Sequence, residues 1–128
     1  MTESKTSPQY WVAGAMYGGK DDQFPKFLRR GYWKLGWKEA DAPDQAKRRD
    51  QIRAGDRIAI KRMMGQGATT ILITALGVVT EVDDEDKRVY VNWLANDLER
   101  VVESRGCFQS IHGPFDANDP WTKEVFRL

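Results

Sequence analysis

YWVAGAMYGGKDDQFPKFLRRGYWKLGW, residues 10–37, is the stretch around which this chain is organised. Its apolar start, residues 10–13, is typical of a strand, and glycines follow it at positions 14, 18 and 19. A short helical pattern comes next, and Trp33 and Trp37 stand at its end. Glycine lets a backbone approach a ligand closely or adopt positive φ without a Cβ penalty. The stretch therefore predicts a glycine-rich loop beside aromatic faces, a pocket suited to a planar ligand.

The spacing of Gly14, Gly19 and Lys20 matches that of a phosphate-binding P-loop between a strand and a helix. That motif continues with a Ser or Thr whose hydroxyl binds Mg²⁺, whereas this chain continues with Asp21 and Asp22. Two carboxylates would repel phosphates. They suit the start of a helix, where they accept hydrogen bonds from free N–H groups and complement the helix dipole. We therefore reject a P-loop nucleotidase.

The composition predicts one soluble globular domain. The chain has 128 residues, of which 41% are hydrophobic and 30% charged. We expect residues 1–8, which are polar, to form a disordered tail and residues 9–128 to form the domain. No apolar run approaches the length of about 20 residues that spans a bilayer, so we expect no membrane partner. The single Cys107 cannot form an internal disulfide, which favours a cytoplasmic location and a core position for its side chain.

Charge is distributed unevenly along the chain. The net charge of +1 argues against an extended electrostatic grip on a duplex. Between residues 20 and 38, however, six cations stand against two carboxylates, a balance of +4. Between residues 81 and 103, eight carboxylates stand against three cations, a balance of −5. A charged run is usually a solvated face, but here the aromatic-rich stretch is also the basic one, which favours a polyanionic ligand.

Hydrophobic periodicity predicts most of the elements. We expect strands at 10–15, 57–62, 69–82 and 88–94, and helices at 22–30 and 41–52. Gly31 is expected to end the first helix and Gly77 to bend the longest strand. The last three strands, joined by tight turns, predict an antiparallel meander.

The C-terminal quarter gives weaker patterns. Residues 96–102 suit a helical turn or an edge strand, residues 106–114 suit a strand followed by a turn, and Asp119-Pro120 suits the start of a final helix. One strand, two helices, a meander and mixed elements predict an α+β fold. We expect a strongly bent sheet or small β-barrel with helices on one side.

The sequence resembles EVE-type domains of the PUA-like superfamily, especially those attached to modification-dependent restriction GTPases. The resemblance covers residues 10–114. It is carried by WVAGAMYGGKDD (11–22), GYWKLGW (31–37), GDRIAIK (55–61), ALGVVT (75–80) and VYVNW (89–93). A more distant resemblance is to YTH domains, which share the strand–loop–helix–Trp layout and a later strand ending in Trp.

The resemblance implies a PUA-like barrel that holds one extruded, often methylated, nucleobase in an aromatic cage. Trp33 corresponds to the Trp that opens the cage in YTH domains, and residues 14–21 correspond to the loop whose backbone reads the base edge. Tyr17, Trp37 and Met63 are open alternatives for the second wall, whereas Trp93 corresponds to a structural Trp. The expected ligand-binding set is Ala15, Met16, Tyr17, Gly18, Gly19, Trp33, Trp37 and Met63.

The basic residues near this stretch are expected to contact phosphates, since phosphate contacts position a nucleic acid while base contacts specify it. The expected set is Lys20, Arg29, Arg30, Lys34, Lys61 and Arg62. Stacking on an aromatic is worth roughly 1–3 kcal/mol per base. Extruding a base from a duplex costs a few kcal/mol, which a tight pocket must recover.

Three classes of function follow from this interpretation. The first is a non-catalytic reader of a modified base in DNA or RNA, without cofactor or metal, whose effector is a partner protein or a fused domain. The second is an enzyme on the same fold, which the isolated His112 and Cys107 support poorly. The third is a protein-interaction module that uses the sheet face.

The acidic run at 83–86 lacks the glycine and distant Glu of a calcium-binding EF-hand loop.

Overall fold

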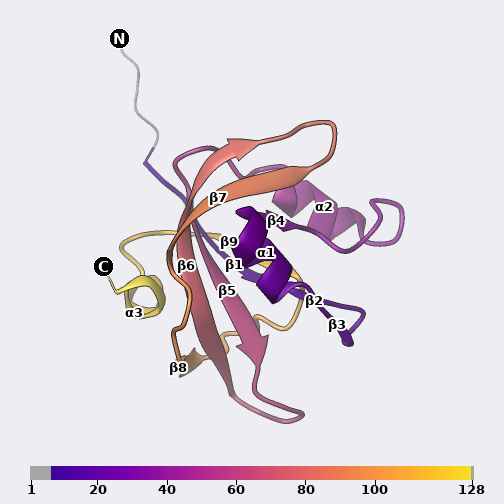
Figure 1. Ribbon diagram of the computed structural model, residues 1–128. Coiled ribbons are helices and arrows are strands. Elements are labelled where there is room, and N and C mark those ends of the chain that lie inside the picture. Colours follow the sequence, from indigo (N-terminus) through magenta and orange to yellow (C-terminus); the bar gives the residue numbers. More distant parts are fainter. Residues whose placement is uncertain (1–6, 128) are drawn as a thin grey trace.

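A strongly curled sheet of mixed strand directions forms the centre of the computed structural model, which describes residues 7–127 (Figure 1). Its strand order is β4-β7-β6-β5-β1-β9, with β8 paired to β6, and a separate two-stranded hairpin joins β2 to β3. The fold is therefore α+β. The elements are β1 (Tyr10–Gly14), β2 (Met16–Tyr17), β3 (Asp21–Asp22), α1 (Phe24–Arg30), β4 (Tyr32–Lys34), α2 (Pro43–Arg49), β5 (Arg57–Met63), β6 (Thr70–Val82), β7 (Arg88–Ala95), β8 (Arg100–Glu103), β9 (Ile111–Phe115) and α3 (Pro120–Phe126).

The predicted meander of β5, β6 and β7 is confirmed, because both pairs are antiparallel. The register of β6 against β7 shifts between Leu76 and Gly77, so the predicted bend lies where the glycine is. A Cβ at Gly77 would collide with the side chain of Val91 and lie 2.9 Å from the carbonyl oxygen of Asn92. The absence of a side chain therefore allows β6 and β7 to approach closely as the sheet curls.

β1 pairs with β5 in parallel, which the sequence did not predict, and its other edge pairs with β9. Both of its faces are covered. Trp11 and Ala13 belong to one core cluster, and Tyr10 and Val12 to the other. The continuous apolar run at the start of β1 follows from this position, because a strand buried on both faces needs no polar alternation.

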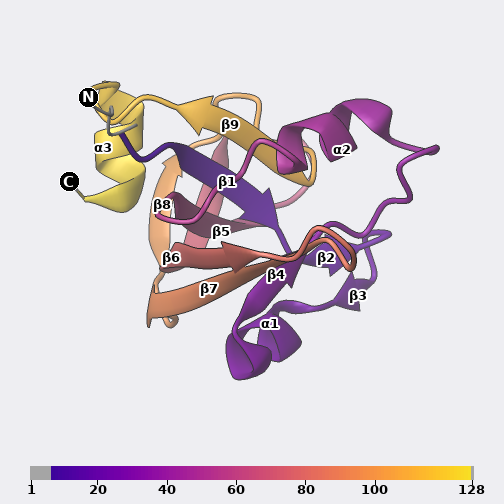
Figure 2. The ribbon, with the colours of Figure 1, turned by 90° about the horizontal axis from the view of Figure 1, so that it is seen from above.

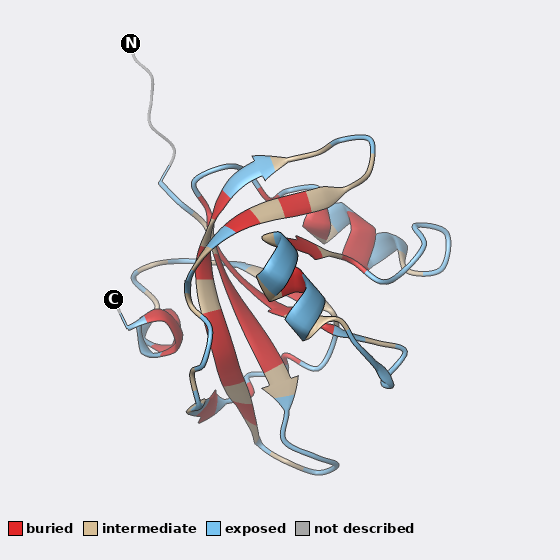
Figure 3. Cartoon of the chain, in the orientation of Figure 1, coloured by how far each residue is buried: buried red, intermediate tan, exposed pale blue. Residues whose placement is uncertain are grey.

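Helices cover both faces of the sheet. Phe27 of α1 and Ala46 of α2 belong to the first core, whereas Trp121 and Val125 of α3 belong to the second. Figure 2 shows α3 on the side of the strands away from α1, and Figure 3 shows the buried residues concentrated along the central strands. The expectation of helices on one side is therefore wrong, because the second face of β1 also needs a cover.

Several expected element ends are confirmed. Gly31 follows α1 with a left-handed φ of 74°, and its N–H donates to the carbonyl of Phe27. The carboxylate of Asp119 accepts from the Trp121 N–H at 2.9 Å and caps α3. Of the alternatives for residues 96–102, the edge strand is the correct one, as β8. The expected tail at 1–8 lies mostly outside the described residues, since only 7 and 8 are described.

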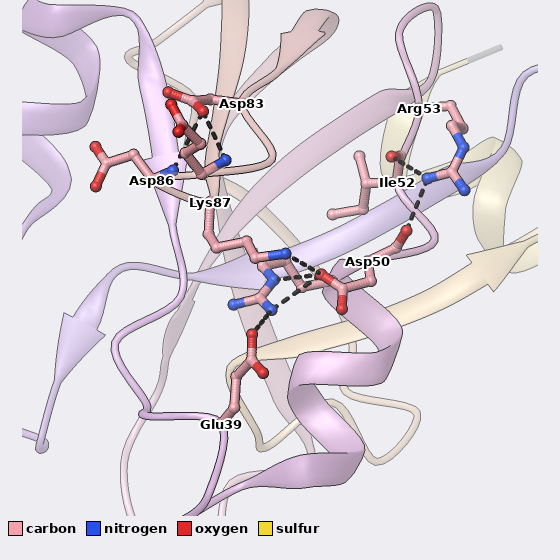
Figure 4. Close-up of polar contacts among 9 residues, drawn as sticks. Glu39, Asp50, Ile52, Arg53, Asp83, Asp86 and Lys87 are labelled. Atoms are coloured by element: carbon pink, nitrogen blue, oxygen red, sulfur yellow. Dashed lines mark hydrogen bonds and ion pairs between the residues drawn. The ribbon is translucent and has the colours of Figure 1, made fainter.

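Ion pairs fasten the end of α2 (Figure 4). The guanidinium of Arg49, whose side chain is 5% exposed, lies 2.9 Å from both the Glu39 and the Asp50 carboxylates. Asp50 in turn lies 3.8 Å from the Lys87 ammonium, beyond the acidic turn.

None of the helices within residues 7–127 combines the length and the apolar character that crossing a bilayer requires.

Asp56, only 5% exposed, joins the start of β1 to the turn before β5. Its carboxylate accepts from the Trp11 indole N–H at 2.9 Å, the Gln9 N–H at 3.1 Å and the Arg53 N–H at 3.0 Å. Its carbonyl accepts from the Val79 N–H of β6 at 2.8 Å. A buried charge is tolerated when hydrogen bonds replace its hydration. Asp56 therefore organises β1, β5 and β6 at one end of the sheet.

We expect Asp56→Ala to lower the free energy of unfolding by about 3 kcal/mol or more, because it leaves several buried donors without an acceptor. Urea unfolding followed by circular dichroism measures the loss. Asp83→Ala is the matched control, since Asp83 also accepts from two backbone N–H groups but is only partly buried in a surface turn. The control should lose less stability; equal losses would contradict the role given to burial.

Candidate functional site

A cleft with a volume of about 970 Å³ opens at the end of β1. Most of its lining comes from residues 14–19, 36–37, 41–45, 60–63 and 108–110. These segments lie far apart in the sequence. The parallel pairing of β1 with β5 brings residues 14–19 next to residues 60–63, with Gly14 opposite Lys61. The predicted pocket beside the glycine-rich loop therefore exists.

Trp33 does not line this cleft. Its side chain is fully buried in the first core, and its indole N–H donates to the carbonyl oxygen of Gly14 at 2.8 Å. The expectation that Trp33 forms an open wall is wrong, because β4 places this ring inside the first core cluster and not on the cleft surface. Its hydrogen bond supports the loop from the core side instead.

Trp37, unlike Trp33, lines the cleft. Its side chain is 50% exposed, and its indole N–H donates to the Ser110 hydroxyl at 3.0 Å, which orients the ring. Met16, Met63 and Phe108 are also exposed and line the same cleft. The sequence did not indicate Phe108 as a site residue, because residues 106–114 were interpreted as a strand followed by a turn.

Tyr17 connects the cleft to the core. Its hydroxyl donates to the carbonyl oxygen of Lys34 at 2.7 Å, and its ring packs against Phe27. Burial, with Tyr32 and Asp21 nearby, raises the pKa of Tyr17 to about 12, so the phenol stays protonated near neutral pH.

The loop depends on glycine in two ways. A Cβ at Gly36 would collide with the Tyr17 ring, so only glycine allows this packing. Gly18 and Gly19 have φ of 61° and 75° and leave the rim without side chains, whereas Ala15 is buried at its base.

Lys61 lies at the floor of the cleft, not at its rim. It is 7% exposed, and its ammonium lies 3.6 Å from the Met63 sulfur. No ion pair includes it among the residues that the structure describes. Burial lowers the pKa of this ammonium. Nearby, the Gln45 amide donates to Gln109 and accepts from the Ile111 N–H, which fixes the adjoining wall.

The expected phosphate contacts do not form one surface. Lys34 is paired with Asp86 at 3.1 Å, and Arg62 with Asp22 at 2.9 Å. Lys34 and Arg62 are therefore each paired with a carboxylate that is distant in the sequence. Lys20 is exposed in the turn between β2 and β3, while Arg29 and Arg30 lie in the last turn of α1 and do not line the cleft. Only Lys61 and Arg62 of the set line it.

The isolated His112 and Cys107 have shifted pKa values. Burial, then Lys61 and Arg48, lower the pKa of His112 to about 4, and its Nε2 accepts from the Gln109 N–H at 2.8 Å. Burial raises the pKa of the Cys107 thiol to about 11. Near neutral pH both groups are therefore uncharged. Within residues 7–127, no cluster of three or more His, Cys, Asp or Glu side chains is arranged to hold a metal ion.

No protein-family model matches this sequence, and no curated protein or solved structure is significantly similar to it. The resemblance to EVE-type domains rests on the short segments quoted above.

The burial of His112 predicts a pH dependence of stability. Its pKa is about 4 in the folded protein and 6.5 for an unperturbed imidazole, so below pH 6.5 the unfolded chain binds the proton more readily. This contribution to stability is therefore lost as the pH falls from 6.5 to about 4. His112→Gln, whose amide oxygen still accepts from Gln109, should remove the loss.

The test compares urea midpoints of the wild type and His112→Gln at pH 7.5 and pH 4.5. Carboxylates titrate in the same range in both proteins, so the difference between the two proteins isolates His112. Equal pH dependence in the two would show that His112 does not titrate as its environment predicts.

Proposed function

We propose that this chain is a non-catalytic nucleic-acid-binding module that takes one unstacked, modified base into the cleft at the end of β1. One observation carries the proposal. Among the described residues, seven large apolar side chains are exposed, and four of them, Met16, Trp37, Met63 and Phe108, line this single cleft. Apolar groups gathered on an otherwise polar surface mark binding sites.

The shape and chemistry of the cleft suit a planar heterocycle. Its volume of about 970 Å³ lies within the range of small-molecule sites, roughly 300–1,000 Å³. The Trp37 ring, held by Ser110, offers a flat face on which any base can stack. The bare rim at Gly18 and Gly19 admits the base edge close to the backbone.

Other side chains around the cleft would make further contacts with the bound nucleic acid. The apolar Met16 and Met63 would accept a methyl group on the base, which is worth about 0.8 kcal/mol when buried. Arg62, which lines the cleft, and Lys20, in the turn between β2 and β3, would contact flanking phosphates. We include in the proposal the assignment of the curled sheet to the PUA-like fold, and an effector supplied by a partner protein or a fused domain.

We expect Trp37→Ala to weaken binding of a single-base site about 10- to 100-fold, because the stacking face contributes roughly 1–3 kcal/mol. Half of this side chain is already in solvent, so the fold should remain intact by circular dichroism. Fluorescence anisotropy with labelled DNA and RNA oligonucleotides, each carrying one unpaired base with or without a methyl group, measures the affinities.

Leu94→Ala is the matched control, since Leu94 is 67% exposed on β7 and does not line the cleft. It should bind like the wild type. If the wild type binds no member of the panel, the proposal fails and the protein-interaction alternative becomes the leading one. If methylation changes no affinity, base binding stands without selectivity for methylation.

A further inference from the structure

The cleft contains a feature that stacking does not use: the buried ammonium of Lys61. Lysine is rarely buried to this extent without an ionic partner. The Met63 sulfur at 3.6 Å is a weak acceptor. Of the two carboxylates that line the cleft, Asp22 pairs with Arg62, and Asp41 forms no ion pair with Lys61. The described residues thus leave most of the hydrogen-bonding capacity of this ammonium unused.

Several contacts place the ammonium at the cleft floor. The position that a Cβ on Gly14 would take lies 3.3 Å from Lys61 Nζ and 3.9 Å from the Gln109 carbonyl oxygen. Gly14, Met63 and Gln109 all line the cleft and come from different segments. Because Gly14 has no side chain, nothing at that position separates the ammonium from the cleft.

The chemistry of an ammonium restricts what it can meet. It donates up to three hydrogen bonds and accepts none. Guanine, cytosine, thymine and uracil each carry an exocyclic carbonyl oxygen, which is a strong acceptor. Adenine carries an exocyclic amino group, a donor, in place of that oxygen, and offers only ring nitrogens as acceptors. A base that places a donor against Lys61 would leave the charge unsatisfied and add a repulsive contact.

We propose that Lys61 is a specificity-determining residue that donates to an exocyclic carbonyl oxygen of the bound base and so selects oxygen-bearing bases over adenine. This inference rests on the proposed function and deepens it. The methyl group, where present, would pack on Met16, so the two selections are compatible. A charge-assisted hydrogen bond inside a cleft corresponds to a preference of about 10- to 100-fold.

The experiment offers one base at a time. Short oligonucleotides in which a single adenine, cytosine, guanine or thymine is flanked by abasic residues are titrated against the full chain by calorimetry. The wild type should bind the three oxygen-bearing bases at least tenfold more tightly than adenine. Lys61→Met, which keeps the length of the side chain and removes the donor, should bind all four bases with similar affinity.

Two further variants separate recognition from folding. Lys26→Met removes an exposed cation of α1 away from the cleft and should keep the wild-type preference. Lys61→Gln, a second neutral replacement that keeps a polar end, should lose the preference as Lys61→Met does. Both Lys61 variants should melt at or above the wild-type temperature, because each removes a buried unpaired charge.

The outcomes distinguish the two proposals. Equal wild-type affinity for adenine and the other bases, or a preference retained by the Lys61 variants, overturns the role of Lys61 while base binding stands. Failure of the wild type to bind any of the four oligonucleotides overturns this inference, and failure to bind the methylated oligonucleotides as well overturns the proposed function.

Discussion

The buried carboxylate of Asp56 is the interaction on which the rest of the structure depends. By accepting from Trp11, Gln9 and Arg53 it fixes where β1 begins relative to β5. The parallel register then follows residue by residue, from Trp11 opposite Ile58 to Gly14 opposite Lys61. The hydrogen bonds of Asp56 at one end of this strand pair therefore determine which groups meet at the other end, where the cleft opens.

Trp33 and Trp37 contribute to that cleft in different ways. Trp33 lies in the core and holds the Gly14 carbonyl, so it stiffens the point at which β1 turns into the loop. Trp37, past the end of β4, is held by Ser110 and presents its ring to solvent. A loop that is anchored where it leaves β1, beside an aromatic ring that is held by a hydrogen bond, suits a planar ligand, because fewer groups have to be ordered on binding.

Sequence patterns predicted the parts of this structure that depend on local chemistry. The meander, the left-handed Gly31 and the Asp119 cap all follow from residues within a few positions of one another. The parallel β1–β5 pair and the ion pairs of Lys34 and Arg62 could not be predicted from local patterns, because they join segments about 40 or more residues apart. The stretch containing Trp33 and Trp37 shows no clear period, so nothing local showed which ring would be buried.

The β1–β5 pair carries opposite charges at its two ends, and they differ in how well they are satisfied. The Asp56 carboxylate has acceptor sites filled by backbone and indole donors, so its burial stabilises the fold. Among the described residues, the Lys61 ammonium has the Met63 sulfur as its hydrogen-bond acceptor and no ion pair, so its burial costs stability that packing elsewhere must offset. Such a cost persists in a folded protein most readily where a ligand recovers it, as strained and desolvated groups concentrate at functional sites. The same desolvation that lowers the pKa of Lys61 also strengthens any hydrogen bond that it makes to an entering oxygen. Under the proposed function, stacking on Trp37 would hold any base, while Lys61 would determine which base binds most tightly.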